Sequence, residues 1–197
     1  MRDPDIISKL PDRPRVSVPP DIGAVSVKIL EERTRYVLRI GGEVQARSGA
    51  KECPLDMPIN SCRQVRGVIV ARLGPDEWFL AGRPVEVVTL VENIGISLSD
   101  SFHCLVEISH RNAGIVISGS RALDLLNGGC ALDLSLKAFP PGTATRTLFG
   151  KIEVLLLLAP QGDSYEIECW RSYLPYLHKF CDELAIAVSA IGNGENR

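Results

Sequence analysis

Short stretches of alternating apolar and polar residues run through much of the chain, for example at residues 25–29, 104–108 and 165–169. Such alternation is typical of strands that bury one face. Bends that contain glycine or proline lie between several of these stretches, as at residues 73–78 and 158–165. Connections this short join antiparallel neighbours, because a parallel crossover needs a dozen or more residues. The pattern therefore predicts mostly antiparallel sheets.

Two longer stretches carry apolar residues at helical spacing. One is expected to run from Pro84 to Gly95, and the other from Ser172 to Gly192. Each helix should cover a sheet with its apolar face. The predicted faces consist of Val85, Val88, Val91 and Ile94 in the first helix, and of Leu174, Leu177, Phe180 or Cys181, Leu184 and Val188 in the second.

A weak internal repeat relates the two halves of the chain. Residues 37–56 and 114–133 align at an offset of 77 residues, and each copy reads as a strand, a glycine-bearing turn, a helix and a Cys-x-Leu-Asp exit. The identical pairs are Ile40 and Ile117, Gly42 and Gly119, Cys53 and Cys130, Leu55 and Leu132, and Asp56 and Asp133. Each half is therefore expected to follow the order β-β-α-β-β-α.

The predicted fold class is α+β, with two related lobes that together form one compact domain. A proline-rich arm at residues 1–23 precedes a first lobe at 24–98 and a second lobe at 99–191, and residues 192–197 form a tail. The density of prolines in the arm excludes a helix or a central strand there.

Composition excludes several classes of protein. The 197 residues are 45% hydrophobic and 23% charged, with a net charge of −2, so no basic excess favours nucleic acid or a membrane surface. No signal peptide is evident, and the longest apolar run, residues 154–159, is too short to span a membrane. A cytoplasmic protein is expected. Its six cysteines lack any Cys-x-x-Cys spacing, which favours buried, reduced thiols over disulfides or zinc.

The sequence also lacks the common cofactor motifs. It contains no Gly-x-Gly-x-x-Gly for a dinucleotide, no Gly-x-x-x-x-Gly-Lys-Ser/Thr for a triphosphate and no His-Glu-x-x-His for zinc. We therefore expect no catalytic residue, cofactor site or metal site on this chain. His178, in the middle of the second helix, is expected to be a packed or half-exposed side chain.

Polar residues gather in the loop Ser109-His110-Arg111-Asn112, directly after a predicted strand. Such a cluster suits catalysis or anion binding, but it equally suits a partner contact or a turn satisfied by its own side chains. Of these, the partner contact is the prediction carried forward for His110, Arg111 and Asn112.

Three further residues are predicted to contact partner proteins. Trp170 and Arg171 stand immediately before the last helix, and both residue types are favoured at the centres of interfaces. Phe139 belongs to a loop at residues 137–147 that is rich in Pro, Gly and Thr. Trp170 could instead belong to the core.

Residues 108–151, with the sequence ISHRNAGIVISGSRALDLLNGGCALDLSLKAFPPGTATRTLFGK, resemble the gamma subunit of heterotetrameric sarcosine oxidase. The strings LGPDEW at 73–78 and WRSYLPYLHKF at 170–180 are similar to strings at the corresponding places in that family. The resemblance covers roughly residues 66–185.

This resemblance implies a non-catalytic subunit of an enzyme that oxidises sarcosine to glycine with release of hydrogen peroxide, and forms methylenetetrahydrofolate when tetrahydrofolate is present. It implies that alpha, beta and delta subunits are the partners and that they hold FAD, FMN, NAD and zinc. It also implies a fold like the folate-binding domain of the glycine-cleavage T protein. The alternative is a free-standing folate-binding one-carbon transferase or T-protein-like factor, which could use Asp76, Glu77, Arg111 and Arg146.

Overall fold

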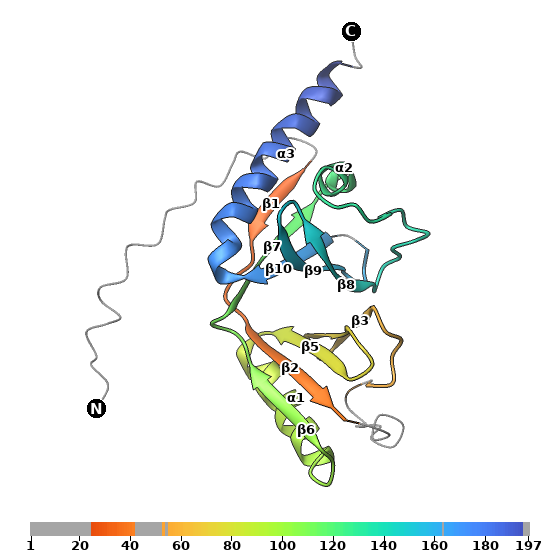
Figure 1. Ribbon diagram of the computed structural model, residues 1–197, viewed down its shortest axis with the longest axis vertical. Helices are drawn as coiled ribbons and strands as arrows, with labels where there is room; N and C mark the ends of the chain where they lie inside the picture. Colours follow the sequence, from red (N-terminus) through yellow and green to blue (C-terminus); the bar gives the residue numbers. More distant parts are fainter. Residues whose placement is uncertain (1–24, 42–52, 54, 163, 195–197) are drawn as a thin grey trace, which may run out of the picture.

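The computed structural model describes residues 25–41, 53, 55–162 and 164–194, and these residues form an α+β fold. They contain two antiparallel five-stranded sheets and three α-helices (Figure 1). The predicted fold class is confirmed in this respect. The proline-rich arm lies outside the described residues. Within the described part of the chain, no helix combines the length and apolar character needed to cross a lipid bilayer.

The two sheets have the same architecture. The first sheet has the strand order β3 (Ser61–Val65), β4 (Val68–Arg72), β5 (Glu77–Gly82), β2 (Thr34–Ile40) and β6 (His103–Glu107). The second sheet has the order β8 (Ala144–Phe149), β9 (Ile152–Leu158), β10 (Ser164–Trp170), β7 (Asn112–Ser118) and β1 (Ser26–Ile29).

Each sheet takes its last strand from the other half of the chain. Strand β1 precedes β2 but pairs with β7, and β6 precedes β7 but pairs with β2. The two sheets therefore do not divide the chain at residues 98 and 99, although their strands correspond one to one. Each half also has one strand more than the predicted β-β-α-β-β-α order. The helix α2 (Ala122–Asn127) follows β7, whereas its predicted counterpart falls largely on residues outside the described part.

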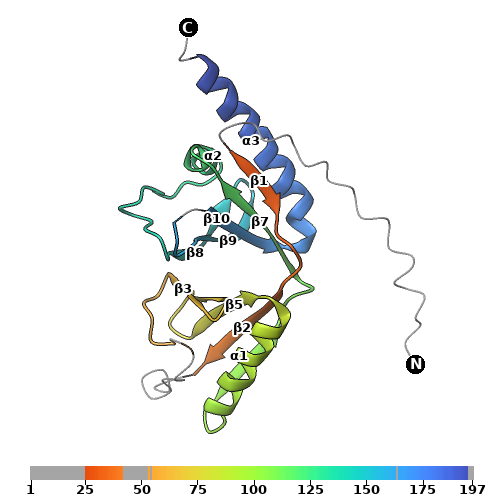
Figure 2. The same ribbon diagram turned by 180° about the vertical axis from the view of Figure 1, so that it is seen from behind.

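The helices α1 (Pro84–Ser97) and α3 (Leu174–Gly194) cover the outer faces of the first and the second sheet, respectively (Figure 2). Both continue through the glycines that were predicted to end them. The predicted face of α3 is confirmed, since Leu177, Cys181 and Val188 are buried.

The predicted face of α1 was partly wrong. The residues that the helix buries are Val87, Leu90 and Ile94, and both Val85 and Val88 are exposed. This helix is apolar on more than one side, so the spacing of its apolar residues alone could not select the side that meets the sheet.

The two sheets face each other, so strand β4 is buried on both sides. Val68 and Val70 point toward α1, whereas Ile69 and Ala71 point toward the second sheet. The apolar core between the sheets consists of Cys62, Ile69, Ala71, Phe79, Ala81, Ile108, Ala144, Leu155 and Leu157. The layers therefore run in the order helix, sheet, sheet, helix.

Candidate functional site at the strand crossover

The exchange of edge strands brings two chain segments together where the sheets meet. Residues 30–33 lead from β1 to β2, and residues 108–111 lead from β6 to β7. The backbone N–H of Ile108 donates to the carbonyl of Arg35 at 2.8 Å, and that of Leu30 donates to the carbonyl of Gly114 at 2.9 Å. Both views show the two segments passing each other (Figures 1 and 2). We call this place the crossover.

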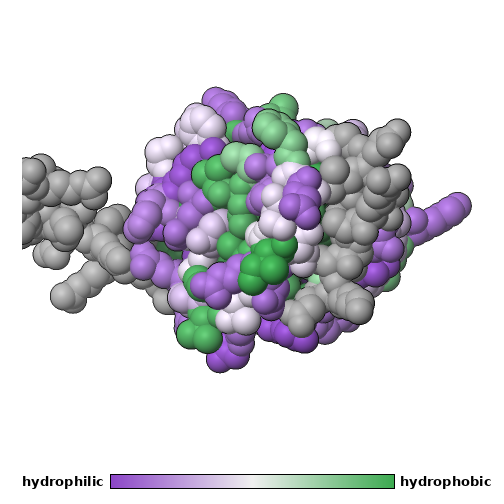
Figure 3. All heavy atoms as spheres, turned by 90° about the horizontal axis from the view of Figure 1, so that it is seen from below, coloured by the Kyte–Doolittle hydropathy of each residue, from purple (hydrophilic) through white to green (hydrophobic). Residues whose placement is uncertain are grey.

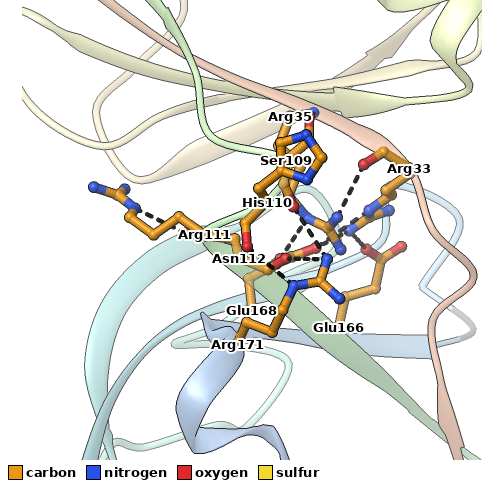
Figure 4. A network of polar contacts seen from close by, with 9 residues as sticks. All are labelled: Arg33, Arg35, Ser109, His110, Arg111, Asn112, Glu166, Glu168 and Arg171. Carbon is orange, nitrogen blue, oxygen red and sulfur yellow. Dashed lines mark hydrogen bonds and ion pairs between the residues drawn. The ribbon is translucent and has the colours of Figure 1, made fainter. Parts of the chain in front are cut away.

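Four charged side chains form a network behind the crossover, which we call the crossover cluster: Arg33, Arg35, Glu166 and Glu168 (Figure 4). Arg33 Nη2 lies 2.5 Å from Glu166 Oε2 and 2.6 Å from Glu168 Oε1. Arg35 Nε donates to the second oxygen of Glu168 at 2.8 Å. Arg33 ends the segment that leads into β2, Arg35 lies on β2, and both glutamates lie on β10, so the cluster joins the two sheets.

The crossover cluster is largely removed from water, and its centre is almost completely buried. Arg35 is 2% exposed and Glu168 is 1% exposed, so an unpaired charge on either would be costly. Burial alone would lower the pKa of Arg33, but Glu168 and Glu166 outweigh it and hold the pKa above its ordinary value. Both carboxylates are bound by guanidinium groups, so neither is placed to act as a free general base.

Five of the six residues predicted to contact partners come together on the outer side of the crossover. Asn112 and Trp170 are paired in the register of β7 and β10. This pairing brings the loop with His110 and Arg111 next to the end of β10. Arg171 then donates from Nε to the carbonyl of His110 at 3.0 Å and from Nη2 to the carbonyl of Ser109 at 3.2 Å.

Phe139 lies apart from this group. Its ring is buried in the core between the second sheet and α3. His178 is buried in α3, as expected for a packed histidine, and its Nδ1 lies 3.0 Å from Asp182 Oδ2.

A stacked aromatic pair, Trp170 and Tyr173, stands exposed at the crossover. Trp170 is 56% exposed and Tyr173 is 41% exposed. Their ring centroids lie 6.1 Å apart with an interplanar angle of 14°. A 3-10 helix, η3 (Arg171–Tyr173), follows Trp170, and residues three apart eclipse each other in such a turn. Sequence reasoning missed Tyr173, although its spacing from Trp170 was visible.

A second charged network bridges the sheets on the other side of their shared core. Glu77 of β5 is buried, and its carboxylate accepts two hydrogen bonds from Arg146 of β8. Arg39 Nη2 of β2 lies 2.8 Å from Glu77 Oε2. Arg39 also pairs with Asp76 at 3.1 Å. Three of the four residues considered for folate binding therefore lie together, but their charges already neutralise one another. The fourth, Arg111, lies at the crossover.

The cysteines are placed as buried thiols, with one exception. All six are free, and Cys104 alone among them is exposed. Burial raises the pKa values of Cys53, Cys62, Cys169 and Cys181 to about 12. In the part of the chain that the structure describes, no three His, Cys, Asp or Glu side chains are grouped so as to hold a metal ion.

Solved structures share this two-sheet α+β fold. The chain is similar to a structure described as heterotetrameric sarcosine oxidase from Corynebacterium sp. U-96 in complex with pyrrole 2-carboxylate, with a TM-score of 0.72, 22% identity, and coverage of 84% of this chain and 85% of that one. It is also similar to the glycine cleavage system aminomethyltransferase T from Bartonella henselae, with a TM-score of 0.64, 10% identity, and coverage of 80% and 45%.

Sequence comparison gives the family. Residues 48–187, more than half of the chain, match the sarcosine oxidase, gamma subunit family. The chain belongs to this family. A search of curated proteins gave no match.

Proposed function

We propose that this chain is a non-catalytic accessory subunit of a heterotetrameric sarcosine oxidase, in which alpha, beta and delta subunits carry FAD, FMN, NAD and zinc. The complex would convert sarcosine to glycine and hydrogen peroxide, and would form methylenetetrahydrofolate when tetrahydrofolate is present. Membership of the gamma subunit family and the likeness to a heterotetrameric enzyme support this assignment.

The exposed aromatic pair is the observation that carries the proposal. Trp170 and Tyr173 present two stacked rings to solvent, and tryptophan and tyrosine dominate the binding energy of protein interfaces when a partner covers them. Arg171 ties the base of the pair to the crossover through the carbonyls of Ser109 and His110. The pair is thus held on a rigid surface and loses little conformational freedom on binding.

The surroundings of the pair suit a recognition surface. Arg111 is exposed in the loop before β7, and its Nε donates to Asn112 Oδ1 at 3.1 Å. Asn112 is in turn paired with Trp170 in the register of β7 and β10. Behind the pair, the crossover cluster fixes the relative position of the sheets. The chain would thus act by presenting a fixed surface on which other subunits are oriented.

The test is co-purification of the tagged chain with its partners, comparing wild type with Trp170→Ala and Tyr173→Ala. We expect each substitution to weaken assembly at least tenfold while the chain keeps its melting temperature. Ile186→Ala removes an apolar side chain of similar exposure from α3 and should leave assembly unchanged. Unchanged assembly by both aromatic variants, or oxidase activity of the isolated chain, would overturn the proposal.

A further inference from the structure

Strand β6 is an outer strand of the first sheet, and one of its edges has no neighbouring strand among the residues that the structure describes. The N–H of Gly41 donates to the carbonyl of Phe102, and the N–H of Ile108 donates to the carbonyl of Arg35. Every second residue from Phe102 to Ile108 therefore directs its backbone groups toward β2. The N–H and C=O groups of the residues between them, 103, 105 and 107, point outward, where an added strand would pair with them.

Three apolar side chains line one face of this edge at alternate positions, and we call them the edge stripe: Phe102, Cys104 and Val106. Phe102 is 86% exposed, Val106 is 48% exposed, and Cys104 is also exposed. Val37, which is paired with Val106, packs against the core between the sheets, so the edge stripe lies on the face turned toward the second sheet. Its exposure shows that the second sheet does not cover β6. An exposed apolar stripe of this kind suits contact with another protein.

The edge also lacks the features that usually prevent strand addition. Its sequence, HCLVE, contains no lysine and no proline, whereas the edge strand β1 of the second sheet carries Lys28 and has α3 packed against it. The polar side chains of β6 already have partners. His103 Nδ1 donates to the carbonyl of Ser101 at 2.9 Å, and Glu107 accepts a hydrogen bond from Ser109 at 2.7 Å. The edge therefore offers a partner its backbone groups and the edge stripe.

The segment around the edge is acidic. Residues 84–107 carry four carboxylates and no lysine or arginine, although the net charge of the whole chain is only −2. Three of these carboxylates belong to exposed residues: Glu92, Asp100 and Glu107. Charge complementarity therefore favours a partner segment that carries lysine or arginine. It disfavours a second copy of this chain, because the same carboxylates would then face one another.

The arginines beside this segment are already paired. Arg83 precedes α1 and forms an ion pair with Glu86. Arg39 lies opposite Cys104 on β2 and pairs with Asp76 at 3.1 Å. These two cations therefore do not neutralise the exposed carboxylates of the edge.

Helix α1 places one of these carboxylates on the side of β6. The carboxylate of Glu86 faces the turn at Gly67, between β3 and β4. Strand β6 lies at the other end of the sheet, so the opposite flank of α1, with Val88 and Glu92 one turn apart, lies on the side of β6. Figure 3 views this end of the molecule and shows apolar residues bordered by hydrophilic ones.

We propose that an extended segment of another subunit of the oxidase adds to β6 as a further strand of the first sheet. Its backbone would pair with residues 103, 105 and 107, and its apolar residues, at alternate positions, would lie against the edge stripe. Its lysine or arginine residues would lie near the exposed carboxylates. This inference rests on the proposed function, because it takes the other subunits as the source of the segment.

The edge is continuous with the surface that carries the proposed function. Strand β6 leads directly into the loop that begins at Ser109, and Arg171 donates to the carbonyl of Ser109 at 3.2 Å. The backbone N–H of Arg35 donates to Ser109 Oγ at 3.0 Å, which ties the same loop to β2. A single partner subunit can therefore contact the aromatic pair and place a strand along β6.

Hydrogen exchange of the full-length chain, measured alone and in the co-purified complex, tests the strand addition. The amides of residues 103, 105 and 107 should exchange at least tenfold more slowly in the complex. The amides of residues 104 and 106, which already face β2, should change less. Equal exchange of the three outward amides in both samples would overturn the inference. Protection that appears in the isolated chain and rises with its concentration would assign the edge to a second copy, which also overturns it.

Val106→Lys tests the edge stripe, because an added lysine is one of the features that prevent strand addition. Since Val106 is half exposed, the chain should keep its melting temperature, while assembly weakens at least tenfold and the outward amides lose their protection in the complex. Ile186→Lys makes the same kind of change at a position of α3 that is 62% exposed, and should leave both measurements unchanged. If the two variants assemble equally well, the edge stripe is not a contact and the inference is wrong.

The double variant Glu92→Gln, Asp100→Asn tests the expected basic character of the partner segment. Assembly should weaken at least threefold at low salt, and it should depend less on the salt concentration than in wild type. Glu183→Gln on α3 is the matched control and should keep the wild-type affinity and salt dependence. A double variant that behaves like this control would contradict a basic partner segment at the edge.

The two proposals can fail separately. Trp170→Ala may abolish assembly while the outward amides of β6 exchange as fast in the wild-type complex as in the free chain. In that case the proposed function stands and strand addition is excluded. A tagged chain that co-purifies with no other subunit overturns the proposed function, and the source of the added strand is lost with it.

Discussion

Arg35 and Glu168 belong to different sheets and to different halves of the chain, yet they share a hydrogen bond of 2.8 Å and both side chains are almost completely buried. Arg35 lies on β2, directly after the segment that comes from β1, and Glu168 lies near the end of β10. The bond therefore connects the second sheet, which contains β1 and β10, to the first sheet, which contains β2. Removing the charge of Glu168 would leave Arg35 without this anionic partner in the interior, whereas Glu168 would still be paired with Arg33 if Arg35 were removed.

Glu168→Gln should destabilise the chain by about 3–5 kcal/mol, because Arg35 would keep its charge without an anionic partner. The free energy of unfolding in urea measures the effect. Asp124→Asn is the matched control, since the pair of Arg121 and Asp124 is on the surface and should contribute less than about 1 kcal/mol.

The double variant Arg35→Met, Glu168→Met separates charge from packing. It removes both buried groups together, so it should be substantially more stable than Glu168→Gln alone. If the double variant loses as much free energy of unfolding as Arg35→Met and Glu168→Met lose together, the cluster does not act through charge pairing, and our account of the crossover is wrong.

The alternation of apolar and polar residues predicted the strands and the antiparallel class of both sheets, but it could not predict the exchange of β1 and β6. Alternation identifies the buried face of a strand but does not identify the strand with which it pairs. Strand β6 would show the same pattern beside β7 as it does beside β2. Pairing depends on contacts between the sheets, which the local sequence does not contain.

The candidate site was predicted in pieces. The loop with His110 and the Trp170-Arg171 pair were singled out separately, and the register of Asn112 with Trp170 joins them. The crossover cluster was missed, because charges two residues apart on a strand usually indicate a face in water. Here that face meets a second sheet. Two segments each carry a pair of like charges two residues apart, Arg33 and Arg35 in one and Glu166 and Glu168 in the other. This pattern was the signal that could have identified the cluster.

Gly114 should tolerate no side chain, because it lies where the two chain segments pass. A Cβ there would come within 2.9 Å of Leu30, 3.0 Å of the Glu168 carboxylate and 3.0 Å of the backbone carbonyl of Ile167. Gly114→Ala should cost about 1–3 kcal/mol in the free energy of unfolding. Gly95→Ala is the counterpart with the opposite sign: its Cβ meets nothing within 4 Å, so the better helix former should stabilise α1 by about 0.5–1 kcal/mol. Equal effects of both substitutions would contradict the close approach at Gly114.

The buried thiols should make the fold less stable in alkali. Burial raises the pKa of Cys53 from about 9 to about 12, so the folded state holds its proton where the unfolded state has lost it. The resulting stability is fully present below about pH 9 and is lost as the pH rises toward 12. Urea midpoints between pH 8 and 10.5 should fall less steeply for Cys53→Ala than for wild type. Cys104→Ala, which removes the exposed thiol, should keep the wild-type slope; a shallower slope for this variant would contradict the assignment.

The folate-binding alternative can be separated from the accessory subunit with the isolated chain. Glu77 is engaged by both Arg39 and Arg146, so neither its carboxylate nor those guanidinium groups are free to hold a pterin ring or a glutamate tail. Titration with tetrahydrofolate, followed by calorimetry, should therefore show no saturable binding in the micromolar range, and the purified chain should carry no flavin absorbance. Arg146→Ala is the diagnostic variant. Micromolar binding to wild type that is lost in Arg146→Ala would mean that the network opens to admit the ligand, and the chain would then be a folate-binding protein in its own right.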